Sequence, residues 1–178
     1  MGARTSAFLT YAFNSIVTYI PLRHVRVAWL RLLGADCPSS VSLFRGVTVY
    51  GAPKLRLGER VSIGYNACLD ARGGISIDHD SVIASFCHLL TADHDVDSSE
   101  FSGRVAPIQI GHHCWICTRA IILKGSSLGD YCVVACNSVV TKSFEGMVVV
   151  GGIPAKYIRA RMCDSDYQIP LHCDPEQP

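Results

Sequence analysis

The amino-acid sequence predicts an all-β solenoid, a triangular coil of about five turns with a helical segment before it and a short tail after it. Two observations predict this fold. An aliphatic residue returns at every sixth position, a period that fits neither the 3.6 residues of a helical turn nor the simple alternation of an independent strand. This frame is interrupted only after complete groups of three hexads. Three short strands therefore close one coil, and inserted segments leave from one corner.

The repeat is clearest in the stretch 110–140, where a small residue also follows each of the first five aliphatic residues by four positions. The first positions of these hexads are Ile110, Ile116, Ile122, Leu128, Val134 and Val140. Counted back to Cys37, the frame slips by two residues after Lys54, by two after Gly74 and by fifteen after His94. Coils stacked at the strand spacing of roughly 4.8 Å would bury the aliphatic residues as ladders and place the small residues at the corners. Residues 37–145 are the expected solenoid, with 95–109 as an inserted loop.

Residues 1–36 are expected to form a helical cap over the first coil. Apolar residues at helical spacing precede Gly34, a suitable C-cap, and a cap would cover strand edges that otherwise promote aggregation. The apolar segment 5–25 is interrupted by Thr, Asn, Ser and Pro21, so it lacks the roughly 20 apolar residues of a membrane-spanning helix. A second role stays open, because four arginines and one acid give the segment the character of a basic amphipathic helix on anionic lipid.

Composition limits the class of protein. A chain of 178 residues is long enough for one domain with a real core. The net charge of +1 and the absence of a basic run with interleaved aromatic residues do not favour nucleic acid as a partner. Nine cysteines are an odd number, and no secretory signal precedes them, so we expect a reducing cytoplasm.

The hexads, together with "VVTK" at 139–142 and "GGIPAKYIRAR" at 151–161, resemble the hexapeptide-repeat acyltransferases, and within them the maltose and galactoside acetyltransferase-like branch. The resemblance covers about residues 37–161. It implies a left-handed parallel β-helix, acetyl-CoA as co-substrate and a homotrimer with sites between subunits. Two turns depart from the family pattern, since its "K-D-[IV]-P-P" is "KSFEG" at 142–146 and its "P-G" corner is Lys124-Gly125.

The resemblance assigns a catalytic base at the start of the long loop. Thr91 and His94 match the family's "T-x-x-H", in which the histidine is the general base. An imidazole exchanges its proton near neutral pH, as this chemistry requires. Asp93 and Asp95 flank the histidine, and either is a candidate to orient its ring. Asp70, in "CLDARGG", is expected to accept a hydrogen bond from the sugar.

The resemblance also implies a site for acetyl-CoA. Trp115, in "IGHHCWIC", matches the family's "IGxxxWIG", whose indole lines the acceptor and thioester site. The positions that match the surface along the pantetheine arm are Thr118, Arg119, Cys136, Thr141 and Lys142. Those that match the segment over the adenine and its phosphates, where cations form charge-assisted contacts, are Ile153, Pro154, Lys156 and Arg159. They belong to the segment 146–178, expected to cover the cofactor.

The sequence does not favour a metal site. The main enzymatic rival, a γ-carbonic anhydrase-like metalloenzyme, is expected to show an H-x4-H pair, and the sequence has none. The remaining histidines are interpreted as surface groups that form no ligand set: His79, His88, His112 and His113. Cys87, Cys114 and Cys132 fall on the small interior position of the hexad and are expected to be core residues.

The sequence thus predicts a cytoplasmic, acetyl-CoA-dependent O-acetyltransferase that acts on a hydroxyl of a saccharide or sugar nucleotide, in the biosynthesis of a surface or exported polysaccharide. Three alternatives stay open: an amino-sugar N-acyltransferase, the γ-carbonic anhydrase-like metalloenzyme and a non-catalytic β-helix assembly protein. The acceptor and the acyl chain length are not predicted, because a few loop residues select them while the hexads build the scaffold.

Overall fold

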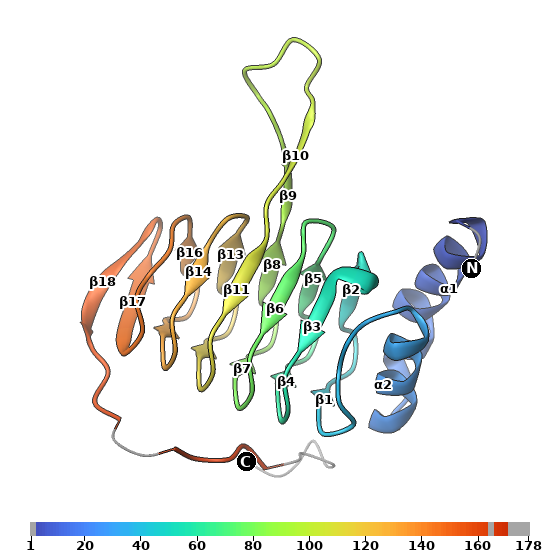
Figure 1. Ribbon diagram of the computed structural model, residues 1–178, viewed down its shortest axis with the longest axis horizontal. Helices are drawn as coiled ribbons and strands as arrows, with labels where there is room; N and C mark the ends of the chain where they lie inside the picture. Colours follow the sequence, from blue (N-terminus) through green and yellow to red (C-terminus); the bar gives the residue numbers. More distant parts are fainter. Residues whose placement is uncertain (1–2, 164–165, 171–178) are drawn as a thin grey trace.

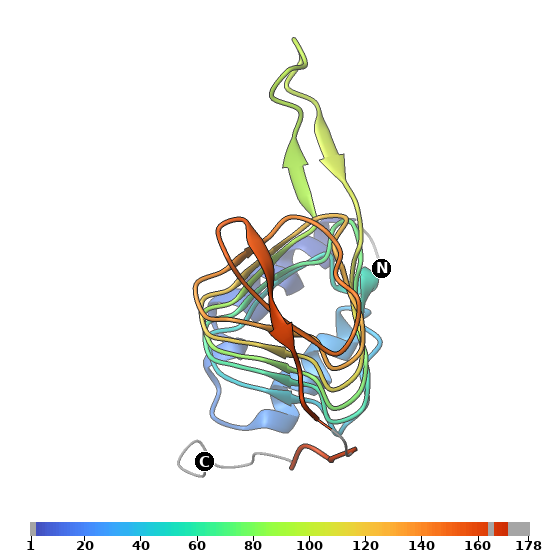
Figure 2. The ribbon, with the colours of Figure 1, turned by 90° about the vertical axis from the view of Figure 1, so that its left-hand side faces the viewer.

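The computed structural model describes residues 3–163 and 166–170 and forms one β-solenoid (Figure 1). Seen along its axis, the coil is a triangle from which one hairpin projects (Figure 2). The first face contains β1 (Ser42–Leu43), β4 (Ser62–Ile63), β7 (Val82–Ile83), β12 (Trp115–Ile116), β15 (Val133–Val134), β17 (Val148–Gly152) and β18 (Ala155–Ala160). The second contains β2 (Thr48–Tyr50), β5 (Cys68–Asp70), β8 (His88–Leu90), β13 (Ile121–Leu123) and β16 (Val139–Val140). The third contains β3 (Leu55–Leu57), β6 (Ile75–Ile77), β11 (Ile108–Ile110) and β14 (Ser127–Leu128).

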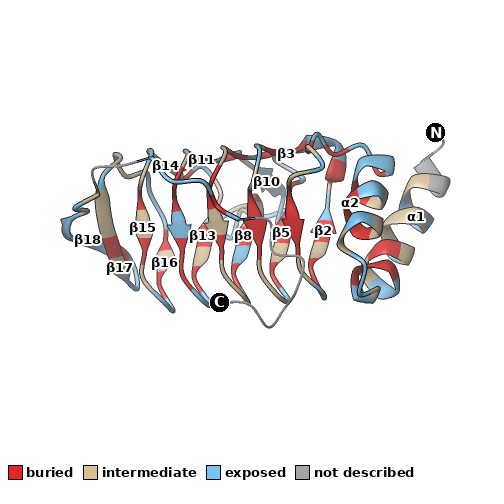
Figure 3. Ribbon diagram, turned by 90° about the horizontal axis from the view of Figure 1, so that it is seen from below, coloured by how far each residue is buried: buried red, intermediate tan, exposed pale blue. Residues whose placement is uncertain are grey.

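The aliphatic ladders are the core of the solenoid. Neighbouring coils pair in parallel so that first hexad positions meet, for example Leu69 with Leu89 and Ile122 with Val140. Their side chains are buried, and strands alternate between buried and more accessible residues (Figure 3). The hexad frame therefore predicts the register as well as the fold, because a slip of one residue would turn every aliphatic side chain outward.

The three corners repeat along the axis, and we number them by the faces they join. The first corner joins the first face to the second, the second corner joins the second face to the third, and the third corner closes the coil. Left-handed backbone recurs at equivalent places, as at Asn66, Phe86, Arg119 and Asn137 on the first corner. The small residue four positions after each first hexad residue is buried directly behind such a turn, as the sequence predicts.

The N-terminal helices cap the first coil, at the right of Figure 1. They are α1 (Ala3–Ser15), the short 3-10 helix η1 (Val17–Tyr19) and α2 (Arg23–Leu32). A second 3-10 helix, η2 (Ala52–Lys54), lies at the second corner. Asn14 replaces a neighbouring strand, since its amide accepts from Val49 N at 2.9 Å and donates to Val49 O at 3.0 Å. Thr18 donates to Val47 O. Free backbone groups of the edge strand are thus satisfied.

Two of the arginines that suggested a lipid-binding helix take part in this cap. Arg23 donates to the carbonyls of Ser39 and Val41, and Arg26 donates to Leu43 O at 2.8 Å. Within the described residues, no helix is both long enough and apolar enough to cross a membrane.

The insertion is a β-hairpin, where the sequence predicted an inserted loop over 95–109. β9 (Ala92–His94) pairs antiparallel with β10 (Gly103–Val105), and the hairpin leaves the second corner of the third coil (Figures 1 and 2). The excursion is closed at its base by the hydrogen bond from Ala106 N to Thr91 O. Two extended segments that leave the coil together satisfy their backbone groups by pairing with each other.

The C-terminal part also contains strands that the sequence did not predict. β17 continues the first face, and β18 turns back antiparallel beside it through Ile153 and Pro154, which are joined by a cis peptide bond. The hairpin of β17 and β18 therefore covers one edge of the last coil, as the N-terminal helices cover the first coil.

Candidate active site

His94 ends β9, at the point where the hairpin leaves the coil. Its Nδ1 lies 2.8 Å from the carbonyl oxygen of Phe101, and its ring stacks on the Phe101 ring at a centroid distance of 4.3 Å. A carbonyl oxygen only accepts hydrogen bonds, so Nδ1 carries the proton in this contact. In the neutral ring, Nε2 is then the free acceptor. This is the tautomer that a general base needs.

Neither neighbouring aspartate orients this ring, contrary to the sequence-based expectation. Asp93 accepts from Arg104 Nε at 3.0 Å, and its other oxygen lies 3.5 Å from Lys124 Nζ. The Arg104 guanidinium is the main cause of the lowered pKa of Asp93. Asp95 lies 3.6 Å from Arg104 Nη1. Both carboxylates thus brace the hairpin through Arg104, and the carbonyl of Phe101 orients the histidine.

The hydrogen-bond partner of Asp70 also differs from the expectation. Its carboxylate is buried and accepts from Arg72 Nε at 2.8 Å and from Arg72 Nη2 at 2.7 Å. These hydrogen bonds lower the pKa of Asp70. A buried carboxylate that is already paired with an arginine is a poor ligand for a sugar hydroxyl, so Asp70 instead fixes Arg72. The Asp-x-Arg spacing at the start of a turn was the available signal, because an aspartate can accept from the backbone N of the residue two positions on, as Asp70 does from Arg72.

A pocket of about 240 Å³ lies at the base of the hairpin. It is lined by residues of β9 and β10, including His94 and Arg104, and by Arg72. Thr91, the first residue of the "T-x-x-H" match, supports it from beneath, because its hydroxyl donates to Asp70 O and accepts from Gly73 N at 2.7 Å. His94 thus shares a pocket with Arg72, an arginine that sequence reasoning missed.

The residues expected to bind acetyl-CoA fall into three groups on one chain. Thr118, Arg119 and Cys136 are exposed on the first corner, in successive coils. Ile153 and Pro154 lie beside them, because Gly152 N donates to Ser138 Oγ at the same corner. Thr141 and Lys142 lie on the second corner, in the last coil.

Three further expected site residues lie on the first face. Trp115 is 50% exposed on β12 and pairs with Val82 and Val133. Lys156 and Arg159 are exposed on β18. The second face therefore separates the His94 pocket from the first-corner group, and one chain does not bring the whole predicted set together.

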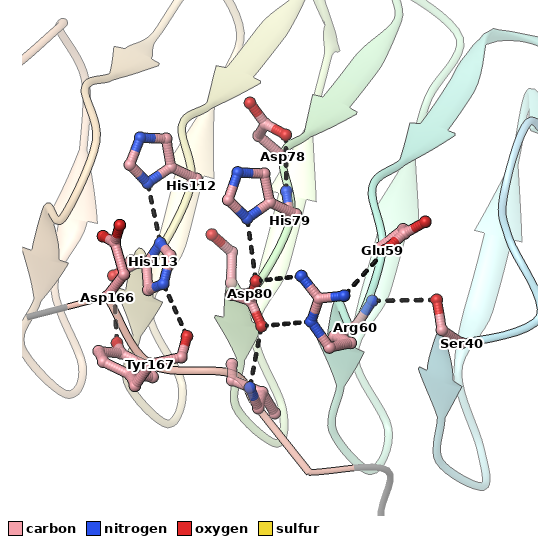
Figure 4. A network of polar contacts seen from close by, with 12 residues as sticks. Ser40, Glu59, Arg60, Asp78, His79, Asp80, His112, His113, Asp166 and Tyr167 are labelled. Carbon is pink, nitrogen blue, oxygen red and sulfur yellow. Dashed lines mark hydrogen bonds and ion pairs between the residues drawn. The ribbon is translucent and has the colours of Figure 1, made fainter.

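The histidines interpreted as surface groups form a cluster at the third corner instead (Figure 4). His79 and His112 stack at 4.9 Å, and His112 Nδ1 lies 2.8 Å from His113 Nδ1. His113 is only 2% exposed and its Nε2 lies 2.7 Å from Tyr167 O, so the segment 166–170 covers this corner. His88 is exposed on the second face. In the part of the chain that is described, no group of three or more His, Cys, Asp or Glu residues could hold a metal ion.

The interior cysteines are core residues, as predicted. Cys87, Cys114 and Cys132 are buried. Burial raises the pKa of the Cys114 thiol to about 12. A thiol in that state is a poor nucleophile.

Comparisons with known proteins show the family of this chain. A family model described as bacterial transferase hexapeptide (six repeats) matches residues 107–142. The chain is 36% identical over 137 residues to the putative colanic acid biosynthesis acetyltransferase WcaF of Escherichia coli (strain K12), with 77% of this chain and 75% of that protein covered. The chain belongs to the hexapeptide-repeat acetyltransferases. The left-handed coil expected from the resemblance comes with this membership.

Two solved structures share the fold of this acetyltransferase. A maltose O-acetyltransferase from Clostridium difficile 630 superposes with a TM-score of 0.80 at 23% identity, covering 89% of this chain and 86% of that one. A galactoside acetyltransferase in complex with coenzyme A superposes with a TM-score of 0.71 at 22% identity, covering 94% of this chain and 87% of that one.

Proposed function

We propose that this acetyltransferase transfers the acetyl group of acetyl-CoA to a hydroxyl of a saccharide, in the biosynthesis of a surface or exported polysaccharide. The observation that carries the proposal is the imidazole of His94, which lines a pocket of about 240 Å³ and whose Nδ1–H donates to the Phe101 carbonyl, so that Nε2 is the proton acceptor. The similarity to WcaF supports a role in polysaccharide biosynthesis. The similarity to the maltose and galactoside acetyltransferases supports a saccharide as the acceptor.

The chemistry needs a base and a bound thioester. Acetyl-CoA supplies the acetyl group as a thioester that a hydroxyl can attack. His94 Nε2 accepts the hydroxyl proton as the oxygen attacks the thioester carbonyl, and the imidazolium then returns a proton to the leaving thiolate. The Phe101 carbonyl keeps its hydrogen bond to Nδ1–H throughout and stabilises the imidazolium. The mechanism requires no acyl-enzyme.

The complete site, in this proposal, lies between subunits of a homotrimer. One chain carries the His94 pocket on its second corner and the exposed Thr118, Arg119 and Cys136 on its first. Apposition of the second corner of one subunit with the first corner of the next would join the two groups, and cyclic symmetry would give three equivalent sites. We place the reaction in the cytoplasm, where acetyl-CoA and sugar nucleotides are available.

Thiol release from acetyl-CoA, measured with a panel of sugars and sugar nucleotides, tests the function. We expect acceptor-dependent release and an acetylated product whose mass spectrum and lability to mild base identify an ester. An amide product would point to the amino-sugar N-acyltransferase. Release no faster than hydrolysis without acceptor, across the whole panel, would contradict the proposal.

A further inference from the structure

We propose that Arg72 binds an anionic group of the acceptor, so that the acceptor is an acidic saccharide. The inference rests on the proposed function and specifies its substrate class. It starts from the pocket beside His94, where Arg72 is the lining residue that comes from the coil and not from the hairpin.

Arg72 is fixed before any ligand arrives. Its Nε and Nη2 donate to the two oxygens of Asp70, and its backbone N lies 3.3 Å from Oδ1. The Asp70 side chain is 7% exposed and the Arg72 side chain 62% exposed. The carboxylate is therefore behind the guanidinium, and a ligand in the pocket meets the guanidinium first. A guanidinium already ordered loses less conformational entropy on binding.

The contacts leave one edge of this guanidinium free. Asp70 uses two N–H groups on the Nε and Nη2 side. The other three of the five N–H groups of an arginine have no acceptor within residues 3–163 and 166–170. Two of them belong to Nη1 and one to Nη2, the edge that can donate two parallel hydrogen bonds to a planar anion.

The other charged side chains of the pocket are already engaged. Arg104 donates to both oxygens of Asp93 and to His94 O, and its Nη1 faces Asp95 at 3.6 Å. Asp93 also lies 3.5 Å from Lys124 Nζ, a group outside the lining of the pocket. The open groups are therefore the acceptor nitrogen of His94 and the donors of Arg72.

These two open groups have opposite requirements. His94 Nε2 takes a hydrogen from the hydroxyl to be acetylated, while Arg72 needs oxygen atoms that only accept. A carboxylate or phosphate on the same saccharide meets the second requirement with two oxygens. A neutral sugar offers single hydroxyls, each with its own hydrogen to place. An acidic saccharide thus fits both groups at once.

Matched acid and neutral sugars test the inference by thiol release. Glucuronate is compared with glucose and galacturonate with galactose, and glucose 6-phosphate separates phosphate from carboxylate recognition. We expect kcat/KM for an acid to exceed that for its neutral partner at least about tenfold, the size of one charge-assisted contact. In Arg72→Gln the ratio should fall toward one, and Arg72→Lys should keep part of it. Arg56→Gln, an exposed arginine on the outer side of β3, is the control and should keep the full ratio.

Two other roles for Arg72 give different results. Stabilisation of the oxyanion would make Arg72→Gln lower kcat equally for acid and neutral sugars, and contact with the cofactor phosphates would raise KM for acetyl-CoA. Either result overturns the inference, as does a wild-type ratio of one or less.

A binding measurement tests the preference for an acidic saccharide separately from turnover. In His94→Ala, saturation-transfer NMR should detect glucuronate in preference to glucose, and the added Arg72→Gln should remove the preference. Preferential binding without transfer to any sugar would contradict the proposed function and leave the acidic ligand supported. Transfer to sugars without any preference for acids would support the proposed function and contradict the acidic ligand.

Discussion

His94 and Phe101 form the smallest unit on which the account depends. The hydrogen bond from Nδ1 fixes the tautomer, and ring stacking fixes the plane of the imidazole. Both contacts come from Phe101, two residues before β10, so the proposed base is positioned only when the hairpin is paired. The position of His94 could be predicted from the family resemblance. Its partner could not, because a backbone carbonyl seven residues away leaves no signal in residue type.

Replacement of His94 by Ala is expected to lower kcat by roughly two to four powers of ten, the contribution of a positioned general base. KM for acetyl-CoA and the mass of the assembly should stay near the wild-type values, since the side chain is exposed and supports no core contact. Steady-state kinetics and light scattering check both. Near-full activity in a folded variant would assign the base to another residue.

Asp80 gives a prediction about stability. Its carboxylate is 2% exposed, and Arg60, the backbone N of Ile169 and His79 all contact it (Figure 4). Hydrogen bonds from Arg60 are the largest cause of its strongly lowered pKa. A lowered pKa in the folded state means that the unfolded state binds the proton more tightly. This contribution is therefore complete above the pKa of an unfolded aspartate, near 4, and is lost as the pH falls below it.

We expect Asp80→Asn to lower the free energy of unfolding at pH 7 by about 1 to 3 kcal/mol, because buried donors lose their charged acceptor. The variant should also lose less stability than the wild type between pH 5 and pH 3. Urea unfolding at these pH values measures both effects. Glu59→Gln is the control, because Glu59 contacts the same arginine from an exposed position and should contribute little. Parallel pH profiles of Asp80→Asn and wild type would contradict the prediction.

At the scale of elements, the coils were predictable and the hairpins were not. The hexad pattern predicts which residues face inward, so ladders such as Leu69 with Leu89 follow from the sequence. The pairing of Asp93 with Arg104 depends on the antiparallel register of β9 and β10, which carries no comparable periodicity. The same holds for β18. Helical spacing predicted the cap, but it did not predict that polar side chains of the helices would satisfy the edge of the first coil.

Asn14 tests the cap. Asn14→Ala removes both contacts with the backbone of Val49 and leaves buried strand groups unsatisfied. We expect a loss of about 1 to 3 kcal/mol in unfolding free energy and faster exchange of the Val49 amide hydrogen. Tyr11→Ala, on the exposed side of α1, should change stability by no more than about 0.5 kcal/mol. Equal stability of the two variants would show that the helices cover the coil without supporting its edge.

At the scale of the whole molecule, the central claim is that the His94 pocket of one subunit works with the first corner of another. The separation of the two groups by the second face is the reason for this claim. A monomer that turns over substrate would contradict it at once, and light scattering should report about three times the 19.3 kDa chain mass.

The most direct test mixes two inactive variants, His94→Ala and Arg119→Glu. Each variant alone should lack activity, the first through its base and the second through its cofactor surface. Co-expressed in equal amounts, they should form mixed trimers in which one interface of three combines an intact His94 with an intact Arg119. Random assembly then predicts recovery of about a quarter of the wild-type activity. If each site lay within one chain, every site in the mixture would carry a defect, and the absence of any recovery in confirmed mixed trimers would contradict the account.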